Sequence, residues 1–476
     1  MAKPPPTAVD QVVSLAKRRG FVYPCGDIYG GTRSAWDYGP LGVELKENIK
    51  RQWWRSMVTA REDVVGLDSS IILPLQTWVA SGHVGEFSDP LTECQSCHKR
   101  FRVDHMQEAY ADREAKKGKE VDPDSVALTE IACPNCGNRG EWTEPREFNM
   151  MLKTYLGVVE DESGLHYLRP ETAQGIFINF ANVVNSTRQK PPFGIAQIGK
   201  SFRNEITPGN FIFRTREFEQ MEMEFFCEPG TQAHWMNYWK DERMRWWQQY
   251  ANYPDHFKFR PHEEDELAHY ADGCFDVEYL YPWGWDELEG IASRTDHDLH
   301  EHEEHSGTKL RYVDPEKEDP ETGEKPWSYR PFVIEPAAGA TRGVLVYLLD
   351  AYHEEERRTA KGETEVRTVL KLHPRLAPIK CAVLPLVKNK PEFPEKAREV
   401  INAMLAAGVP AKYDEKGAIG RRYAKHDEIG TPFCITIDGQ TLEDGTVTIR
   451  YRDTTEQERI AVEDAVEEVR SRLSKV

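Results

Sequence analysis

The 476-residue chain lacks long apolar runs: it has none of the roughly 18 consecutive apolar residues from which a transmembrane helix is built. Its first residues, Met1 to Pro6, also lack the apolar segment of a secretory signal. The first absence excludes a membrane span, and the second argues against export. We therefore expect a cytoplasmic protein with no membrane partner.

Cysteine is scarce, with nine residues in the chain. Four of them form two tight pairs, Cys94-x-x-Cys97 and Cys133-x-x-Cys136. In a reducing compartment such pairs indicate metal ligation rather than a disulfide framework. The two-residue gap lets both thiolates of a pair reach one tetrahedral ion, and four sulfurs leave no open position for catalysis. The sequence thus predicts a structural zinc ribbon; an iron–sulfur cluster and four free thiols are the alternatives.

A surplus of basic residues, which is typical of nucleic-acid-binding proteins, is absent. The chain has 61 Lys and Arg against 80 Asp and Glu, a formal net charge of −19. This charge argues against a nucleic-acid partner for the chain as a whole. Much of the acidity lies in local runs, such as 296–304 and 314–324, and the residues from Lys371 onward are near neutral. Charge alone therefore leaves the partner open.

The length predicts two or three domains, because single cores stop growing at about 250–300 residues. Two prolines interrupt the pattern within 373–378, where we place a linker. Residues 1–372 then form the first domain, with an insertion at 91–142 that carries the cysteine pairs. Residues 373–476 alternate between predicted strands and helices, which indicates a small α/β domain.

The most informative segment is a predicted hairpin, in which 202–205 and 213–222 form antiparallel strands on either side of a Pro-Gly turn. Because side chains alternate across a strand, one face collects Arg214, Arg216, Phe218, Gln220, Glu222 and Glu224. The other face offers Phe213, Met221, Met223 and Phe225 as core. Guanidiniums, a ring and carboxylates on one surface suit a nucleotide with a polyphosphate tail and a ligand that carries an ammonium. A solvated polar face is the plain alternative.

Three further segments add charged residues. Glu171 and Thr172 begin a predicted helix, where they act either as caps or as ligands. The acids within 286–289 would ligate magnesium, or they form an exposed acidic turn. A predicted strand at 331–336 leads through small residues to Arg342, whose charge needs an anionic partner, either a protein carboxylate or a phosphate.

These segments, in this order, resemble the motifs of class II aminoacyl-tRNA synthetases. The amino-acid sequence is most similar to that of the single-chain, homodimeric glycyl-tRNA synthetases, at residues 36–40, 81–83, 167–175, 201–224 and 333–342. The resemblance covers nearly the whole chain. It implies an α+β fold: a class II antiparallel sheet flanked by helices, with a zinc-ribbon insertion and a C-terminal α/β anticodon-binding domain. It also implies a homodimer, formed through the helix at 43–57 and the strand at 64–73 that ends at Pro74; an ordinary edge strand is the alternative.

The resemblance further implies an ATP-dependent ligase. Such an enzyme activates glycine with ATP to glycyl-adenylate and then transfers glycine to the 3′ end of tRNA(Gly), with Mg2+ and a structural Zn2+ as cofactors. Neither step demands a nucleophilic side chain, so catalysis would rest on positioning and charge neutralisation. A narrow acidic pit would exclude larger amino acids by overlap, and no editing domain is expected.

Carried over by position, the ATP-binding residues would be Arg203, Asn204, Glu205, Phe213, Arg214, Phe218, Leu288, Glu289, Gly339 and Arg342. Arg203 would clamp the α-phosphate and Glu205 would accept from the adenine amino group. Phe218 and Arg342 would stack on the two faces of adenine. Arg214 would hold the terminal phosphate and Glu289 would bind magnesium. Arg203 and Arg342 would be the catalytic residues.

The glycine-binding residues would be Arg100, Glu171, Phe218, Gln220, Glu222, Glu335 and Gly339. The three glutamates of this set form the acidic pit, and Arg100 would lie near the substrate carboxylate. The chain departs from the family at Ala337, where many members have serine.

Two other functions compete with this hypothesis. A related class II enzyme for proline or threonine would share the nucleotide motifs, but the three glutamates argue against it. An inactive relative that only binds nucleic acid would have lost arginines of the nucleotide site, which are present. In the C-terminal domain, Arg421, Arg422 and Lys425 are either phosphate contacts or part of a solvated face.

Overall fold

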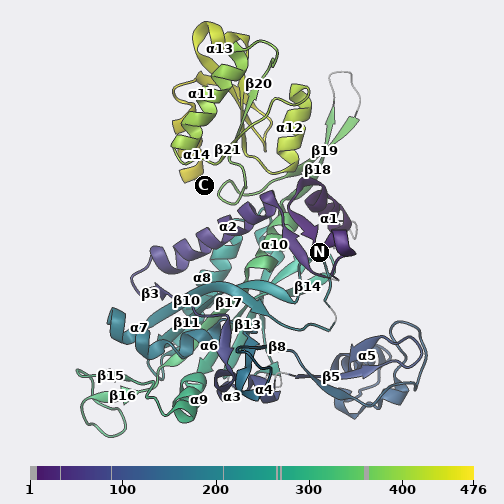
Figure 1. The fold of residues 1–476 in the computed structure, drawn as a ribbon, viewed down its shortest axis with the longest axis vertical. Helices are drawn as coiled ribbons and strands as arrows, with labels where there is room; N and C mark the ends of the chain where they lie inside the picture. The colour runs from purple at the N-terminus through teal and green to yellow at the C-terminus, as the bar shows by residue number, and fades with distance from the viewer. Residues whose placement is uncertain are drawn as a thin grey trace.

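A seven-stranded sheet forms the centre of the N-terminal part of the molecule (Figure 1). The computed structural model describes residues 8–32, 34–86, 88–206, 208–263, 266–268, 271–358 and 364–475, so Met1 to Pro6 lie outside the described residues. The strand order is β12 (Phe257–Pro261), β13 (Gly273–Tyr281), β14 (Gly284–Thr295), β17 (Phe332–Gly339), β11 (Glu217–Cys227), β10 (Phe193–Phe202) and β3 (Val64–Gly66). Neighbouring strands are antiparallel, except that β3 runs parallel to β10.

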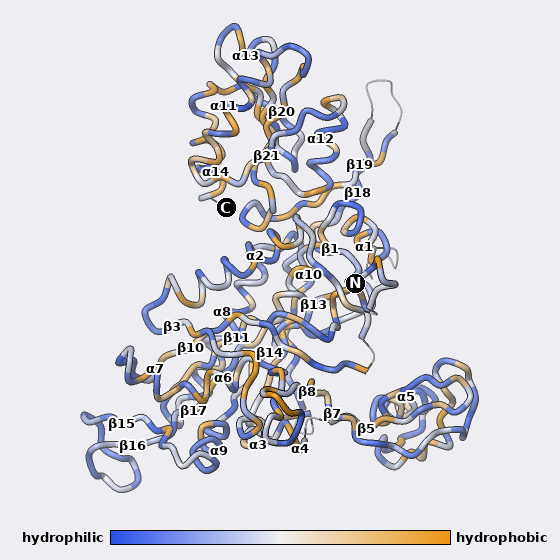
Figure 2. The backbone as a smooth tube through the Cα atoms, in the orientation of Figure 1, coloured by the Kyte–Doolittle hydropathy of each residue, from blue (hydrophilic) through white to orange (hydrophobic). Residues whose placement is uncertain are grey.

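Four helices pack with one face of this sheet in the main core: α1 (Ala8–Arg19), α2 (Pro40–Trp54), α8 (Gln232–Gln248) and α10 (Ala340–Ala351). The predicted apolar stripe of α2 is confirmed, because Leu45, Ile49 and Trp53 are fully buried. The helix begins three residues earlier than predicted, at Pro40, since proline is favoured at the first helical position. Figure 2 shows the apolar segments concentrated in these central strands and in α10. The predicted antiparallel sheet flanked by helices is confirmed.

The second core lies where α6 (Ala173–Phe177), α7 (Phe180–Thr187) and α9 (His297–Ser306) pack on the sheet. The sequence predicts one continuous helix at 173–184, but the structure breaks it after Phe177. The Asn179 side chain donates to the carbonyl of Gly175 (2.8 Å) and so competes with the helical backbone at the break.

Two other predicted elements are wrong in extent. The predicted strand at 64–73 is divided between β3 and β4 (Ile72–Pro74), which belongs to a separate sheet of order β4-β9-β8 with β9 (Leu165–Leu168) and β8 (Leu152–Tyr155). The Trp-rich stretch 230–270 also predicts a helix, but the structure ends the helix α8 at Gln248, and β12 follows. The remaining elements of this part are short: β1 (Val22–Pro24), β2 (Trp36–Tyr38), α3 (Leu75–Ala80), α4 (His83–Glu86), β15 (Tyr312–Asp314), β16 (Trp327–Tyr329), β18 (Tyr352–Arg358) and β19 (Thr364–Leu370).

The cysteine pairs lie in a small unit that projects from the end of the core near α3 and α4 (Figure 1). It contains β5 (Ser88–Glu93), β6 (Arg100–Arg102), α5 (Val103–Ala115) and β7 (Arg146–Asn149), with strand order β6-β5-β7. Met106, Val126 and Ile131 form its own buried core. Ser88 pairs with Asn149 at its neck, so the chain leaves and re-enters the core side by side.

The C-terminal part is a five-stranded sheet of order β21-β20-β22-β23-β24 with four helices. Its strands are β20 (Cys381–Pro385), β21 (Ala411–Tyr413), β22 (Phe433–Ile437), β23 (Thr446–Tyr451) and β24 (Gln457–Ala461), and its helices are α11 (Glu392–Ala406), α12 (Ile419–Glu428), α13 (Gly439–Asp444) and α14 (Ala465–Lys475). The alternation of strands and helices was predicted, apart from α13 and β24. Across the described part of the chain, no helix has both the length and the apolar content of a membrane span.

Candidate active site

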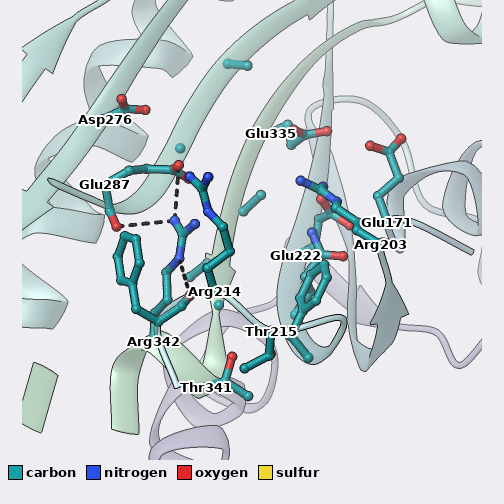
Figure 3. A pocket seen from close by; sticks show the side chains of 18 of the residues that line it. Glu171, Arg203, Arg214, Thr215, Glu222, Asp276, Glu287, Glu335, Thr341 and Arg342 are labelled. Atoms are coloured by element: carbon teal, nitrogen blue, oxygen red, sulfur yellow. Dashed lines mark hydrogen bonds and ion pairs between the residues drawn. The ribbon is translucent and has the colours of Figure 1, made fainter. Parts of the chain in front are cut away.

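A cavity of about 300 Å³ opens on the sheet face opposite α2, α8 and α10 (Figure 3). Many of the residues expected to bind ligand line it: Glu171, Arg203, Glu205, Phe213, Arg214, Phe218, Gln220, Glu222, Glu335, Gly339 and Arg342. Four expected residues do not line it, namely Arg100, Asn204, Leu288 and Glu289. The pocket is therefore lined by segments that are far apart in the sequence, whereas these four residues lie outside it.

Strand β11 forms the floor of the pocket, because its side chains alternate between the cavity and the core. Phe218, Gln220 and Glu222 face the cavity, while Met221 and Met223 are buried in the core on the other side. The predicted faces of this strand are thus correct from Glu217 onward. The two preceding arginines were expected on the same strand, but the strand begins after them.

Arg214 and Arg216 belong instead to the loop between β10 and β11. Gly209 and Arg214 form an isolated bridge that folds the loop back, and Arg214 reaches the pocket from there. Arg216 does not line the pocket; it lines an adjoining cavity. The expectation that both arginines share one strand face is wrong, because a turn rather than a strand carries them.

The cationic half of the pocket (Phe213, Arg214, Glu287 and Arg342) is organised around Arg342. Its guanidinium carbon lies 4.5 Å from the centre of the Phe213 ring, and its Nη1 lies 3.1 Å from Oε2 of Glu287. The charge of Arg342 holds the pKa of Glu287 below its ordinary value, and Arg203 and Arg214 add to this effect. The two guanidiniums of this half, those of Arg214 and Arg342, thus carry more positive charge than its one carboxylate, Glu287, neutralises.

Arg203 extends from the end of β10 on the other side of the pocket (Figure 3). Its Nε donates to the carbonyl of Pro170 (3.0 Å), and its guanidinium carbon lies 5.4 Å from the Phe218 ring centre. The next residue, Asn204, donates its backbone N–H to the carbonyl of Met150 (2.7 Å). Arg203 therefore lies beside the acidic side chains, across the cavity from Arg342.

Strand β14 contains a bulge that corrects the prediction for Glu289. Val277 pairs with Glu289 and Glu278 pairs with Glu287, so Leu288 is the extra residue on β14. Leu288 is fully buried in the main core. The extra residue leaves Glu287 in the pocket and turns Glu289 to the opposite face.

Glu289 lies below the sheet rather than in the pocket. Its carboxylate accepts from Nε of Arg243 (2.7 Å) and from the indole N–H of Trp247, both on α8, and it is fully buried. Glu289 is therefore not placed to bind magnesium at the pocket, and Glu287 occupies the position that was expected for it.

The acidic half of the pocket (Glu171, Glu222 and Glu335) brings together carboxylates from three elements. Burial and the charges of Glu335 and Glu171 raise the pKa of Glu222 to about 8. Burial also raises the pKa of Glu335. Glu171 behaves differently: burial acts against its charge, but His83 and Arg294 hold its pKa below the ordinary value. Glu171 is therefore the carboxylate of the three whose charged form is favoured by its neighbours.

Arg294 is the guanidinium next to these carboxylates, and sequence reasoning missed it. It donates to Glu335 (2.6 Å) and to both oxygens of Asp298 (2.8 and 2.9 Å), and it lies 4.0 Å from Glu171. The local sequence carries no signal for Arg294, because its carboxylate partners come from other elements: Glu335 from β17 and Asp298 from α9.

Arg100 was expected near the substrate carboxylate, but it lies on β6 in the projecting unit. Its side chain is 68% exposed and pairs with Glu93 (3.0 Å). Arg100 therefore does not line the pocket in this structure, and its contact with the substrate carboxylate stays a prediction.

A third group of polar residues lies at the edge of the pocket on β13 and just beyond β12. The Nε2 atom of His262 lies 2.9 Å from Oδ2 of Asp276, and Cys274 is close to both. Burial, together with the charge of Glu287, raises the pKa of Asp276 to about 6. Asp276 and Glu287 are therefore two neighbouring carboxylates that a cation would stabilise.

The four paired cysteines converge in the projecting unit. Their sulfurs lie within 4.8 Å of one another, with Cys94 3.6 Å from Cys136 and Cys97 3.7 Å from Cys133. A tetrahedral zinc ion with Zn–S distances of about 2.3 Å holds its sulfurs about 3.8 Å apart. The backbone N–H of Lys99 lowers the pKa of Cys97 to about 6, which favours a thiolate. The donor set therefore fits a structural zinc site.

The basic residues of α12 do not form a common surface. Arg422 is buried and donates to the carbonyls of Pro385 and Asp414 (2.7 and 3.0 Å), so its predicted role as a phosphate contact is wrong. Lys425 is half-buried and pairs with Asp414 (2.7 Å), whereas Arg421 is exposed. Successive residues of an α-helix point about 100° apart, so the adjacent Arg421 and Arg422 face in different directions.

Comparison with protein families gives two matches. Residues 158–272 match the tRNA synthetase class II core domain (G, H, P, S and T), and residues 380–472 match an anticodon binding domain. These segments correspond to the part of the chain that carries β10, β11 and Glu171 and to the C-terminal sheet.

The chain is also similar to curated proteins over nearly its whole length. It is 60% identical over 466 residues to the glycine–tRNA ligase of Mycolicibacterium vanbaalenii, covering 97% of each chain. It is 61% identical over 465 residues to that of Cutibacterium acnes, covering 97% of this chain and 95% of the relative. Its identity to the glycine–tRNA ligase of Streptomyces coelicolor is 56% over 468 residues, 98% of each chain.

Proposed function

This chain belongs to the glycine–tRNA ligases, which are class II aminoacyl-tRNA synthetases, and we propose that it binds ATP and glycine in the two halves of the pocket described above. It uses ATP to activate glycine and transfers the glycyl group to tRNA. In the proposal, the cationic half takes the nucleotide and the acidic half takes the amino group of glycine. The observation that carries it is the meeting of Arg203, Arg214 and Arg342 with three glutamates in one cavity.

We assign the nucleotide contacts as follows. Arg203 holds the α-phosphate, Arg214 holds the terminal phosphate, and Glu205 accepts from the adenine amino group. The adenine ring lies between Phe218 and Arg342. In support, the guanidinium carbon of Arg342 already lies 4.5 Å from the centre of an aromatic ring, that of Phe213, and a planar guanidinium can stack on aromatic faces. The positive charge of these arginines stabilises the negative charge that develops as pyrophosphate leaves.

We assign the ammonium of glycine to Glu171, with Glu222 and Glu335 closing the pit. In support, burial and the neighbouring carboxylates raise the pKa of Glu222, and burial raises that of Glu335, so an added cation would stabilise the charged carboxylates. The ammonium of glycine, placed beside Glu171, adds a positive charge that stabilises the three carboxylates, as the guanidinium of Arg294 does. A substrate with a larger side chain meets the walls of the pit, which discriminates more strongly than the about 1–3 kcal/mol that a missing methylene provides.

Mg2+ accompanies ATP in class II synthetases, and Glu287 and Asp276 are the oxygen ligands that fit it best here. The ion neutralises the phosphates when it is bound. The proposal predicts that Glu287→Gln raises the Mg2+ concentration needed for half-maximal activity, whereas Glu289→Gln does not. An equal shift in the two variants would refute this assignment.

We propose zinc as the ion of the four cysteines and a structural role for it. Metal analysis of the purified chain should give one zinc per chain, and Cys97→Ser combined with Cys136→Ser should remove it. Iron in place of zinc would support the iron–sulfur alternative.

We propose that the enzyme acts in the cytoplasm as a homodimer, and that residues 373–476 contact the anticodon of tRNA(Gly) while residues 1–372 carry the catalytic site. In support of the dimer, exposed apolar side chains gather around β4 and β8: Ile71, Ile72, Tyr155, Leu156, Val158 and Val159. Ile72→Asp together with Leu156→Asp should convert the dimer into monomers in sedimentation experiments. A wild-type chain that sediments as a monomer would contradict this proposal.

One assay tests the function as a whole: exchange of labelled pyrophosphate into ATP with each amino acid in turn. Exchange with glycine alone is expected. Exchange that depends on proline or threonine would identify a related synthetase, and exchange with none would identify an inactive relative.

A further inference from the structure

His83 lies in the wall behind the acidic half of the pocket and has no role in the assignments above. It is 9% exposed, and its Nε2 lies 3.5 Å from Oε2 of Glu171. Its Nδ1 lies 2.8 Å from the hydroxyl of Ser81, and its ring packs edge-on against Trp78 at 5.4 Å. Both ring nitrogens therefore have fixed neighbours, and one of these neighbours is the carboxylate proposed to bind the substrate.

The two oxygens of Glu171 have different neighbours. Gln174 donates to Oε1 (3.0 Å), and Arg294 lies 4.0 Å from the same oxygen. His83 is on the side of Oε2. If His83 is removed, Oε2 loses this neighbour, and the carboxylate is free to rotate toward Gln174 and Arg294.

We propose that His83 is a positioning residue for glycine: it holds the Glu171 carboxylate in the orientation, and with the charge, that the substrate ammonium requires. This inference rests on the proposed binding of glycine in the acidic half. His83 acts through Glu171 and does not itself line the pocket.

The electrostatics of the acidic half support this role. Among the glutamates of the pocket, Glu222 and Glu335 have raised pKa values, whereas His83 is the strongest of the groups that lower the pKa of Glu171. Other titratable or charged groups on the elements packed around Glu171 are Arg294 on β14, Glu222 and Glu224 on β11, Glu335 on β17, and Asp298 and His302 on α9. Of these groups, Arg294 is the one that lowers the pKa of Glu171.

The backbone of His83 is anchored as firmly as its ring. The side-chain amide of Asn149 donates to the carbonyls of His83 (3.3 Å) and Val84 (3.1 Å). The Asn149 carbonyl oxygen of the same side chain accepts from the N–H of Met151 (2.8 Å). The position of His83 relative to Glu171 is therefore set by residues on both sides of the projecting unit, which is what a positioning residue needs.

The experiment measures pyrophosphate exchange as a function of glycine, ATP and pH in the full-length enzyme. For His83→Ala we expect KM for glycine to rise about tenfold, because a contact to a charged group is lost, while KM for ATP changes less than about twofold. The acid limb of kcat/KM for glycine should move to higher pH, since Glu171 loses the group that keeps it ionised. His83→Gln, whose amide can donate to Oε2, should recover most of the affinity for glycine.

A matched control is His98→Ala, because His98 also lies close to a carboxylate, that of Glu93 at 3.3 Å, but on the exposed surface of the projecting unit. It should leave both KM values unchanged. Urea unfolding of each variant separates a loss of folding from a loss of positioning. Equal rises in the two KM values, or a glycine KM that His83→Ala leaves unchanged, would overturn the inference alone. Absence of glycine-dependent exchange in the wild-type enzyme would overturn the proposed function and this inference with it.

Discussion

The two halves of the pocket hold charges of opposite sign in different surroundings. In the cationic half, Arg342 is 20% exposed at its side chain and pairs with Glu287, whose side chain is 47% exposed. In the acidic half, Glu222 and Glu335 are nearly inaccessible to solvent, and their pKa values are raised. ATP can thus replace an exposed ion pair at low cost, whereas glycine brings a cation to a place where carboxylates repel one another.

This difference indicates how each substrate is recognised. In the cationic half, the arginines are placed to bind phosphate, and their exposed counter-ion, Glu287, is easily displaced. In the acidic half, burial and mutual repulsion disfavour the charged forms of the carboxylates, and only a small cation can offset this cost, because larger groups do not fit. Two variants test whether the halves act separately, and a third tests the protonation of a carboxylate in the acidic half.

The largest effect is expected in the cationic half. Arg342→Ala should lower kcat/KM for ATP about 10²–10³-fold, because the lost guanidinium stabilises charge in the transition state. The measurement is glycine-dependent pyrophosphate exchange at varied ATP. Arg245→Ala is the control, since Arg245 is exposed on α8 and pairs with Glu242, and it should retain wild-type activity. A loss below tenfold in Arg342→Ala would contradict the assignment of this half.

A smaller but more selective effect is expected from Glu171→Gln. It removes the charge that meets the ammonium, so KM for glycine should rise about 10–100-fold, while KM for ATP stays within about twofold of wild type. Steady-state exchange kinetics at saturating ATP measure this. A parallel loss of ATP affinity would show that the two halves are not separate.

The smallest effect concerns stability and sharpens the contrast within the acidic half. The pKa of Glu222 is about 8 in the folded chain, against about 4.3 in an unfolded one, so the folded state binds the extra proton between these values. Wild-type stability should therefore fall as pH rises from about 5 to 8, and Glu222→Gln should remove part of this slope. At pH 8 the variant should be more stable than wild type by on the order of 2 kcal/mol in urea unfolding, and at pH 5 the two should be similar. The same difference at both pH values would contradict a neutral Glu222.

Much of the site follows from local rules. The alternation of β11 was enough to separate Phe218, Gln220 and Glu222 from Met221 and Met223, because a half-buried strand has a period of two residues. The four cysteines were grouped by their spacing alone. In each case the signal lies within a few neighbouring residues.

The errors have tertiary causes. The bulge at Leu288 depends on pairing with β13, and nothing in the local sequence reveals which of two nearby glutamates it turns into the pocket. Arg100 was assigned to the pocket by its position in the family resemblance, but it lies on β6 of the projecting unit and does not line the pocket, because its place depends on how that whole unit is attached. Arg422 looked like a surface cation, but its guanidinium is buried against backbone carbonyls that belong to other elements.

The neck of the projecting unit has a consequence for the architecture of the chain. Because Ser88 pairs with Asn149, and Asn149 also bonds to the carbonyls of His83 and Val84, about sixty residues enter and leave through two adjacent strands. The unit is thus a long elaboration of what could be a short hairpin connection. Replacing the residues beyond this neck with a tight turn should leave the central sheet folded, so the metal-binding module can be exchanged as a single piece.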